Sequence, residues 1–197
     1  MAFSLKQELL RKLIHLSSFW IVGLIWVCPR LLAIILLSLV SVVVLMAEYE
    51  THKNSLCARI YRFLFSPVLR EKESNSSFGF SGAPYVLLAA LILVMVMKRP
   101  VAMFALSVLL LSDTMAALVG RAIGRHKLIG KKTWEGTCAF LIAGFVVCWI
   151  FNWGFGLPLV RSMLGVCLGC LGDLFNDKLH IDDNLSIPLL AALPFLF

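Results

Sequence analysis

The stretch SDTMAALVGRAIGRHKLIGKKTWEGTCA (residues 112–139) joins two apolar segments through a basic loop. Asp113 stands near the end of the first apolar run, and Glu135 stands at the foot of the second. The loop between them holds one histidine and five other basic residues: Arg121, Arg125, His126, Lys127, Lys131 and Lys132. A lipid bilayer accepts charges at such positions only where something offsets their desolvation, so we expect the chemistry of the protein here.

The composition indicates an integral membrane protein. The 197 residues are 60% hydrophobic and 15% charged, whereas a soluble domain is about half apolar and about a quarter charged. The first apolar segment lacks a small-residue cleavage site, so we interpret it as a membrane span and not as a signal peptide. The formal net charge of +7 favours loops near anionic lipid or phosphate substrates, and no nucleic-acid partner is expected.

The six cysteines lie mostly in apolar runs. Cys167 and Cys170 form a CxxC pair, but it lies inside an apolar helix and no second pair accompanies it. We therefore favour packing for the cysteines over redox or metal chemistry.

The apolar runs predict an all-α fold, a polytopic helical bundle of six or seven transmembrane helices in one catalytic domain over residues 1–197. The first helix is expected near Leu5, behind a capping box that begins at Ser4. Residues 56–69 are expected to form an amphipathic interfacial helix. The last run, 187–197, is too short to cross roughly 30 Å at about 1.5 Å per residue, so it is either a half-span or the end of a longer helix. The six predicted spans are residues 13–27, 31–47, 84–97, 101–119, 137–151 and 159–172.

The charge distribution predicts a cytoplasmic N-terminus in the cell membrane. With that orientation all but four of the 18 Lys and Arg residues lie inside, as the positive-inside rule requires. All 11 acidic residues also fall on the cytoplasmic side or at the cytoplasmic ends of spans. A transporter needs polar groups near the midplane or on both sides, so this one-sided pattern favours an enzyme whose site faces the cytoplasm. The four outside cations are Arg30, Lys98, Arg99 and Arg161.

A polar stripe follows the first helix. Glu8, Arg11, His15 and Ser18 are spaced by three, four and three residues, which places them on one helical face. Such a stripe normally faces the interior of a membrane bundle. The alternative is a juxtamembrane helix whose cations contact lipid headgroups, and the sequence leaves both open.

Asp113 needs a cation or a metal, because burying an unpaired carboxylate is costly. The small residues that follow it either keep its face open or pack helices together, and packing explains the glycines but not the aspartate. The basic loop is not a P-loop, because five residues separate Gly124 from Gly130, where a P-loop has four, and an extra lysine precedes Thr133. Its cations are expected either to clamp phosphates or to contact anionic lipid.

The segment GDLFNDKLHIDDN (residues 172–184) is the strongest candidate metal site. Asp173 and Asp177 are four residues apart, on one face of a helix, and Asp182 and Asp183 follow in a turn. Carboxylates this close disfavour joint ionisation unless a cation intervenes, and their oxygens suit Mg²⁺. A solvated acidic loop is the alternative.

Together these patterns resemble the CTP-dependent lipid-alcohol kinase family of dolichol, phytol and diacylglycerol kinases, which is related to the phosphatidate cytidylyltransferases. Ser112 and Thr133 stand where that family usually has glycine and serine, and the HGG-containing signature of the cytidylyltransferases is missing after Asp173. The matching motifs are ELLRKLIH (8–15), SDTMAALVGRAIGR (112–125), KKTWEGTCAF (131–140), GDLFNDKL (172–179) and DDNLSIPL (182–189).

The resemblance implies transfer of a phosphoryl group from CTP to the hydroxyl of a membrane lipid alcohol: polyprenol or dolichol, phytol, or diacylglycerol. Our hypothesis is that Asp173 binds Mg²⁺ together with Asp182 or Asp183, and that Asp113 either binds the metal or orients the lipid hydroxyl. The expected catalytic residues are Asp113, Glu135, Lys131 and Lys132. The residues expected to bind substrate or nucleotide are Arg11, Lys12, His15, Arg121, Arg125 and Asn184.

Three alternatives stay open at this point. The first is phosphatidate cytidylyltransfer, which would use nearly the same site. The second is a small transporter, and the third is a lipid-binding membrane protein without catalysis. The oligomeric state also stays open: Gly165 and Gly169 form a GxxxG pattern, which offers a face for helix pairing and so for a homodimer.

Overall fold

The centre of the bundle is one continuous rod made of three pieces: α7 (Arg99–Val108), η1 (Leu109–Asp113) and α8 (Thr114–Ala122). The computed structural model describes residues 5–51, 81–179 and 181–197. In the rod, 78% of the most apolar window is buried, against at most 39% in the other long apolar helices. Phe104 and Leu109 are completely buried. The rod is therefore the core around which the other helices pack.

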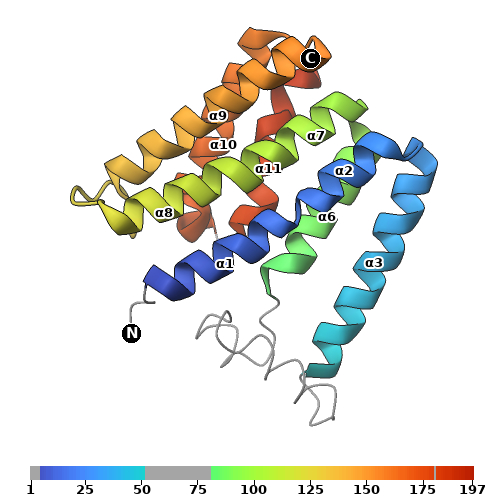
Figure 1. The fold of residues 1–197 in the computed structure, drawn as a ribbon, viewed down its shortest axis with the longest axis horizontal. Helices are drawn as coiled ribbons and strands as arrows, with labels where there is room; N and C mark the ends of the chain where they lie inside the picture. Colours follow the sequence, from blue (N-terminus) through green and yellow to red (C-terminus); the bar gives the residue numbers. More distant parts are fainter. Residues whose placement is uncertain (1–4, 52–80, 180) are drawn as a thin grey trace.

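The remaining helices surround this rod (Figure 1). On one side, α9 (Trp134–Phe155) packs on all three pieces of the rod, and α10 (Leu159–Leu179) packs on α9. On another, α1 (Leu5–Ser17) packs on α8 and α2 (Phe19–Val27) packs on α7. The short helix α11 (Asp183–Ala192), which η2 (Leu193–Phe195) follows, packs on α6 (Gly82–Val96), α7 and α10. The outermost helix, α3 (Arg30–Thr51), packs on α6.

The predicted all-α membrane bundle is confirmed. Five helices are long and apolar enough to cross a membrane, and the described residues form no strand beyond an isolated bridge between Lys127 and Thr133. The third predicted span is the shorter helix α6, of 15 residues. The last apolar run belongs to a helix that begins earlier, at Asp183. The five long helices are Glu8–Val27, Arg30–Tyr49, Arg99–Ala122, Trp134–Phe155 and Leu159–Asn176.

Other predictions concern residues that the structure does not describe. The first helix begins at Leu5, as expected, but Ser4 of the capping box lies outside the described residues. The predicted interfacial helix at 56–69 lies outside them as well. Which end of the bundle faces the cytoplasm stays a prediction.

Two arginines close the end of the bundle where α2 meets α3 and α6 meets α7 (Figure 1). Arg99 donates to the carbonyl oxygens of Trp26 (3.2 Å) and Cys28 (2.9 Å), and Arg30 donates to the carbonyl of Met95. The last carbonyls of a helix have no partner inside the helix, so each guanidinium satisfies acceptors that would otherwise face lipid. Two of the four cations predicted on the outer side thus act as helix caps.

Glycines set the closest helix contacts. A Cβ on Gly136 of α9 would lie 2.8 Å from the carbonyl oxygen of Ala116 and 3.2 Å from the Cα of Gly120, both in α8. The small residues after Asp113 therefore pack α8 on α9. In α10, Gly165 and Gly169 face α11 of the same chain, because a Cβ on Gly165 would collide with the backbone there. The GxxxG face predicted for a homodimer is thus used inside the chain, and a homodimer would need another surface.

Candidate active site

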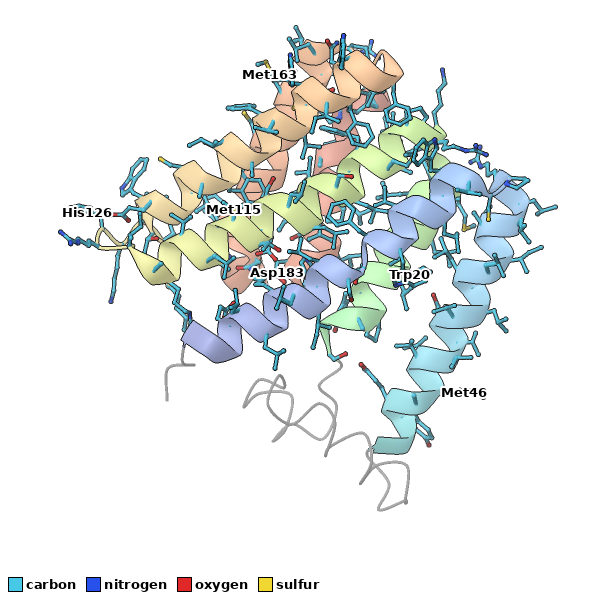
Figure 2. All side chains as sticks on the ribbon, viewed as in Figure 1. Trp20, Met46, Met115, His126, Met163 and Asp183 are labelled. Atoms are coloured by element: carbon cyan, nitrogen blue, oxygen red, sulfur yellow. The ribbon has the colours of Figure 1, made fainter. Side chains whose placement is uncertain are left out.

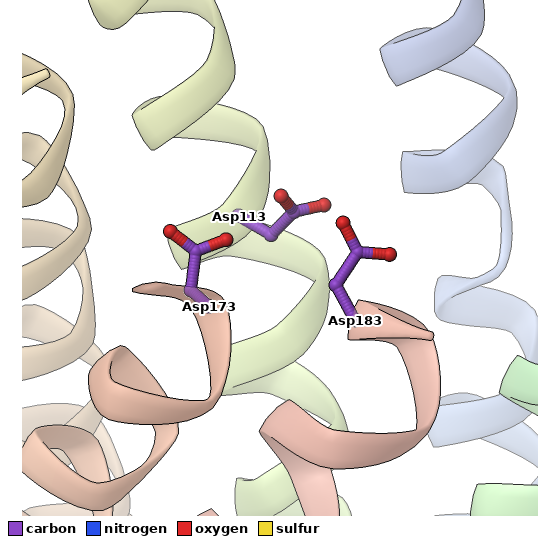
Figure 3. Close-up of side chains that lie close together, drawn as sticks. All are labelled: Asp113, Asp173 and Asp183. Carbon is purple, nitrogen blue, oxygen red and sulfur yellow. The ribbon is translucent and has the colours of Figure 1, made fainter. Parts of the chain in front are cut away.

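Three aspartates from three helical elements lie close together (Figure 3). Asp113 comes from η1, Asp173 from α10 and Asp183 from α11. Each is buried, with 5%, 1% and 8% of its surface exposed, and one carboxylate oxygen of each lies within 4.8 Å of those of the other two. The sequence placed Asp173 and Asp183 in one candidate metal site, and the structure adds Asp113 to them.

A π-helical turn carries Asp113 to this position. Residues Leu109–Asp113 form the turn inside an otherwise α-helical rod. Such a turn inserts one extra residue and shifts the side chains that follow it, and π-turns of this kind are frequent at functional sites. The hydroxyl of Thr114 donates to the carbonyl oxygen of Leu110 at 2.6 Å, which satisfies a backbone acceptor within the turn. The insertion cannot be recognised in the apolar pattern of the sequence.

The start of α11 holds Asp183 in the cluster. Asp182 is the N-cap residue, and its side chain accepts hydrogen bonds from the backbone N–H of Asn184 at 3.0 Å and from the Asn184 side-chain amide at 2.8 Å. A capping aspartate satisfies one of the backbone donors at a helix start. The structure thus places Asp182 and Asn184 beside the cluster as a capping pair, whereas Asp183 points into it (Figure 3).

Two lysines and a histidine line the cluster. Lys12 of α1 donates to the Asp113 carboxylate, and Lys132 donates to the Asp173 carboxylate. The Nε2 atom of His15 lies 3.6 Å from Oδ2 of Asp113. Burial alone would lower the pKa of Lys132, but the nearby carboxylates outweigh it and raise that pKa above its ordinary value of 10.5, so the ammonium stays charged.

The polar stripe of the first helix faces the interior of the bundle. Glu8 and Lys12 are both buried, with 4% of each exposed. The Glu8 carboxylate pairs with Arg11 one turn away and with Arg121 of α8 at 3.4 Å. The structure therefore supports the interior alternative over headgroup contact for this stripe. Glu8 was missed as a site residue, although its place at the start of the stripe was a signal in the sequence that could have identified it.

The basic loop forms a tight hairpin that leads into α9. Lys132 donates its backbone N–H to Ile129, and Gly130 takes a left-handed conformation with φ 57°. The Glu135 carboxylate lies 2.8 Å from Nδ1 of His126, which stands at the outer end of the hairpin (Figure 2). Glu135 is therefore occupied in bracing the hairpin, outside the three-aspartate cluster. The predicted cations Arg125 and Lys131 are exposed on the hairpin, and Lys132 alone reaches the cluster.

The cluster has the donors and the spacing of a divalent-cation site. Mg²⁺ binds oxygen ligands at about 2.0–2.1 Å, so two of its ligands are at most roughly 4.2 Å apart. A small inward movement of the three carboxylates reaches that spacing. The hydroxyls of Ser112 and Ser186, each next to or one turn from an aspartate, are buried without a hydrogen-bond partner. Buried polar atoms are normally satisfied, so the surroundings can accept further polar ligands.

The family follows from a comparison of the whole chain with known proteins. The sequence model of the Cytidylyltransferase family matches residues 7–179. The chain belongs to this family. The match includes Lys12, Asp113, Lys132 and Asp173, and it ends just before Asp183. No solved structure matches the chain.

Several relatives of this cytidylyltransferase-family protein are named as kinases. A CTP-dependent diacylglycerol kinase of Saccharomyces cerevisiae is 25% identical over 97% of this chain and 73% of its own length. A phytol kinase of a Synechocystis species is 30% identical over 64% of this chain and 58% of its own length. An uncharacterised protein of Rickettsia prowazekii is 27% identical over 91% of this chain and 88% of its own length. The resemblance to CTP-dependent lipid kinases is thus confirmed.

Proposed function

We propose that this protein is a lipid kinase that transfers the γ-phosphate of CTP to the hydroxyl of a lipid alcohol at the cytoplasmic face of the membrane. One observation carries the proposal: three buried carboxylates meet two lysines inside a bundle of apolar helices. Phosphoryl transfer requires mainly positioning and charge neutralisation, and this set of side chains offers both. The relatives named as diacylglycerol and phytol kinases support the same reaction class.

The aspartates would hold Mg²⁺. Asp173, Asp183 and Asp113 supply the oxygens, with Asp183 in preference to its neighbour Asp182, which caps α11. Magnesium bound there would offset negative charge on the phosphates of the nucleotide. Two lysines would neutralise the remaining charge on the phosphates: Lys132, which reaches the cluster from the hairpin, and Lys12, which reaches it from α1. The ammonium group of a lysine is a mobile point donor for phosphate oxygens.

The cations around the aspartate cluster and on the hairpin would bind and orient the triphosphate. Arg11 and Arg121 both pair with the buried Glu8, so both guanidinium groups are kept at the contact between α1 and α8. Lys131 and Arg125 are exposed on the hairpin. His15 is placed to orient the acceptor hydroxyl, because its ring lies beside Asp113 and its Nε2 atom is buried without a hydrogen-bond partner. We propose that the whole chain acts as one catalytic domain.

The first experiment identifies the labelled product. Purified protein with Mg²⁺ is incubated with γ-labelled CTP or ATP and a panel of lipid alcohols: polyprenol, phytol and diacylglycerol. We expect label on one lipid, greater transfer from CTP than from ATP, and no transfer after the metal is chelated. Absence of labelled lipid from either nucleotide with any acceptor would overturn the kinase proposal.

Two neighbouring aspartates provide a matched pair of variants. Asp183→Asn should lower turnover at least about 100-fold, beyond the roughly 10–100-fold typical of groups that only support a ligand. Asp182→Asn should have much less effect, since asparagine is as good an N-cap as aspartate. Equal losses in both variants, with unchanged thermal unfolding, would contradict the assignment of Asp183 over Asp182.

Cytidylyl transfer to phosphatidate is the second candidate, and the family that matches the chain favours it. The same carboxylates and lysines would then act on the α-phosphate of CTP. Product analysis separates the two reactions, because a kinase releases CDP and a cytidylyltransferase releases pyrophosphate. Pyrophosphate together with a CDP-lipid would replace the kinase by this alternative.

A further inference from the structure

The aspartate cluster carries its own cations. Lys12 donates to Asp113 and Lys132 donates to Asp173, and the two lysine side chains are 5% and 26% exposed. Buried carboxylates of like charge are strongly unfavourable unless cations accompany them. These lysines are therefore what allows two of the three carboxylates to lie charged inside the bundle.

The third aspartate is held differently. Asp183 accepts a hydrogen bond from the backbone N–H of Asn184 at 3.1 Å, and no lysine or arginine of the described chain forms an ion pair with it. It lies in the first turn of α11, where the helix dipole favours a negative charge. The cluster therefore combines two carboxylates that form ion pairs with lysines and one that is held by a backbone N–H.

We propose that Lys12 and Lys132 are exchangeable counter-cations, which release Asp113 and Asp173 to a divalent cation only when a polyphosphate arriving with that cation accepts their ammonium groups. This inference rests on the proposed function, because it requires that the cluster hold a divalent cation during transfer. It deepens that function by assigning an order of binding: metal and nucleotide enter together.

The charges explain this coupling. Three carboxylates and two lysines give the cluster a net charge of −1, so a divalent cation added alone would make the cluster net positive. That cation would also lie close to two ammonium groups in a poorly solvated site, where like charges repel strongly. Phosphate oxygens remove the conflict, since they are strong acceptors for ammonium donors. The flexible four-carbon stem of lysine lets each ammonium move between a carboxylate and a phosphate.

The positions of the two lysines match this role. Lys12 lies deep, on a helix that packs against α8, and Lys132 lies nearer to solvent, on the hairpin before α9. Lys132 interacts electrostatically with all three carboxylates. A nucleotide that approaches from the hairpin side would therefore meet Lys132 first and Lys12 afterwards.

The test measures the binding of Mn²⁺ alone, by electron paramagnetic resonance, to the purified full-length protein in detergent. Lys12→Met and Lys132→Met each remove one competing cation, so each should bind Mn²⁺ about tenfold or more tightly than the wild type. Lys127→Met is the matched control, because Lys127 is an exposed hairpin lysine and its loss changes the net charge equally. Its affinity for Mn²⁺ should stay within about twofold of the wild type, since exposed charges are screened by salt.

Folding is checked by thermal unfolding of each variant. Lys12→Met leaves Asp113 buried beside fewer cations, so if that variant does not fold, Lys132→Met decides the question. Folded lysine variants that bind Mn²⁺ no more tightly than the wild type would overturn the inference. The assay contains no nucleotide or lipid, so its outcome is separate from the proposed function. If the protein transfers phosphate but its lysine variants bind Mn²⁺ no more tightly, only the inference about the lysines is overturned.

Discussion

The contact between α8 and α9 depends on Gly136, and Gly136→Ala should destabilise the protein. An added Cβ would lie 2.8 Å from the carbonyl oxygen of Ala116 and 3.2 Å from the Cα of Gly120. Both are backbone atoms, so neither can move away by a side-chain rotation. Gly154 lies in the same helix, and a Cβ there would have no neighbour within 4 Å. The same substitution at the two positions isolates the cost of the contact.

The expected cost follows from the overlap. A carbon–oxygen contact usually lies at about 3.3–3.6 Å, so α8 and α9 must separate locally by about 0.5 Å or more. Overpacking of this kind typically costs about 1–3 kcal/mol. Replacing glycine by alanine also stabilises a helix by up to about 1 kcal/mol through its higher helix propensity, and by less near a helix start. We expect a net loss of about 1–2 kcal/mol for Gly136→Ala, and no loss for Gly154→Ala.

Thermal unfolding in detergent can resolve this difference. A thiol-reactive dye reports unfolding, because Cys148 and Cys170 are free and buried. In a chain of this size, each kcal/mol of lost stability lowers the unfolding temperature by about 2–4 °C. Gly136→Ala should therefore unfold roughly 2–8 °C below the wild type. Turnover should fall as well, because α8 continues from the turn that carries Asp113. If Gly136→Ala unfolds at or above the temperature of Gly154→Ala, the glycine contact does not hold the helices together.

Three further variants test other contacts. Gly165→Ala should lower the unfolding temperature by separating α10 from α11, whereas Gly169→Ala, which meets its neighbours at 3.4 Å or more, should not. Glu48→Ala should lower the free energy of unfolding by about 1.5–3 kcal/mol, because this buried carboxylate accepts hydrogen bonds from the N–H and the hydroxyl of Ser81, which caps α6. An unfolding temperature equal to that of the wild type would contradict this. Glu135→Gln should raise the KM for CTP without changing the unfolding temperature, since it loosens the hairpin at the exposed His126; an unchanged KM would remove the hairpin from nucleotide binding.

The helices and the polar face of the first helix could be predicted because both depend on local patterns. Long apolar runs predict membrane helices from length alone, and spacings of three and four residues place Glu8, Arg11 and His15 on one face. The partners of that face could not be predicted in the same way. Lys12 pairs with Asp113 across 101 residues, and Lys132 pairs with Asp173 across 41. A periodicity identifies the inward side of a helix, but it carries no information on which distant helix lies opposite.

Asp113 shows the same limit more sharply. Its burial and its need for a cation were evident from the apolar run around it, yet its role stayed open between metal ligand and lipid contact. Its direction depends on a π-turn, and its grouping depends on how closely α10 and α11 approach the rod. Because each carboxylate comes from a different helical element, the geometry of the site is the geometry of helix packing. Glycines remote from the aspartates, such as Gly136 and Gly165, therefore determine the site as much as the charged residues that form it.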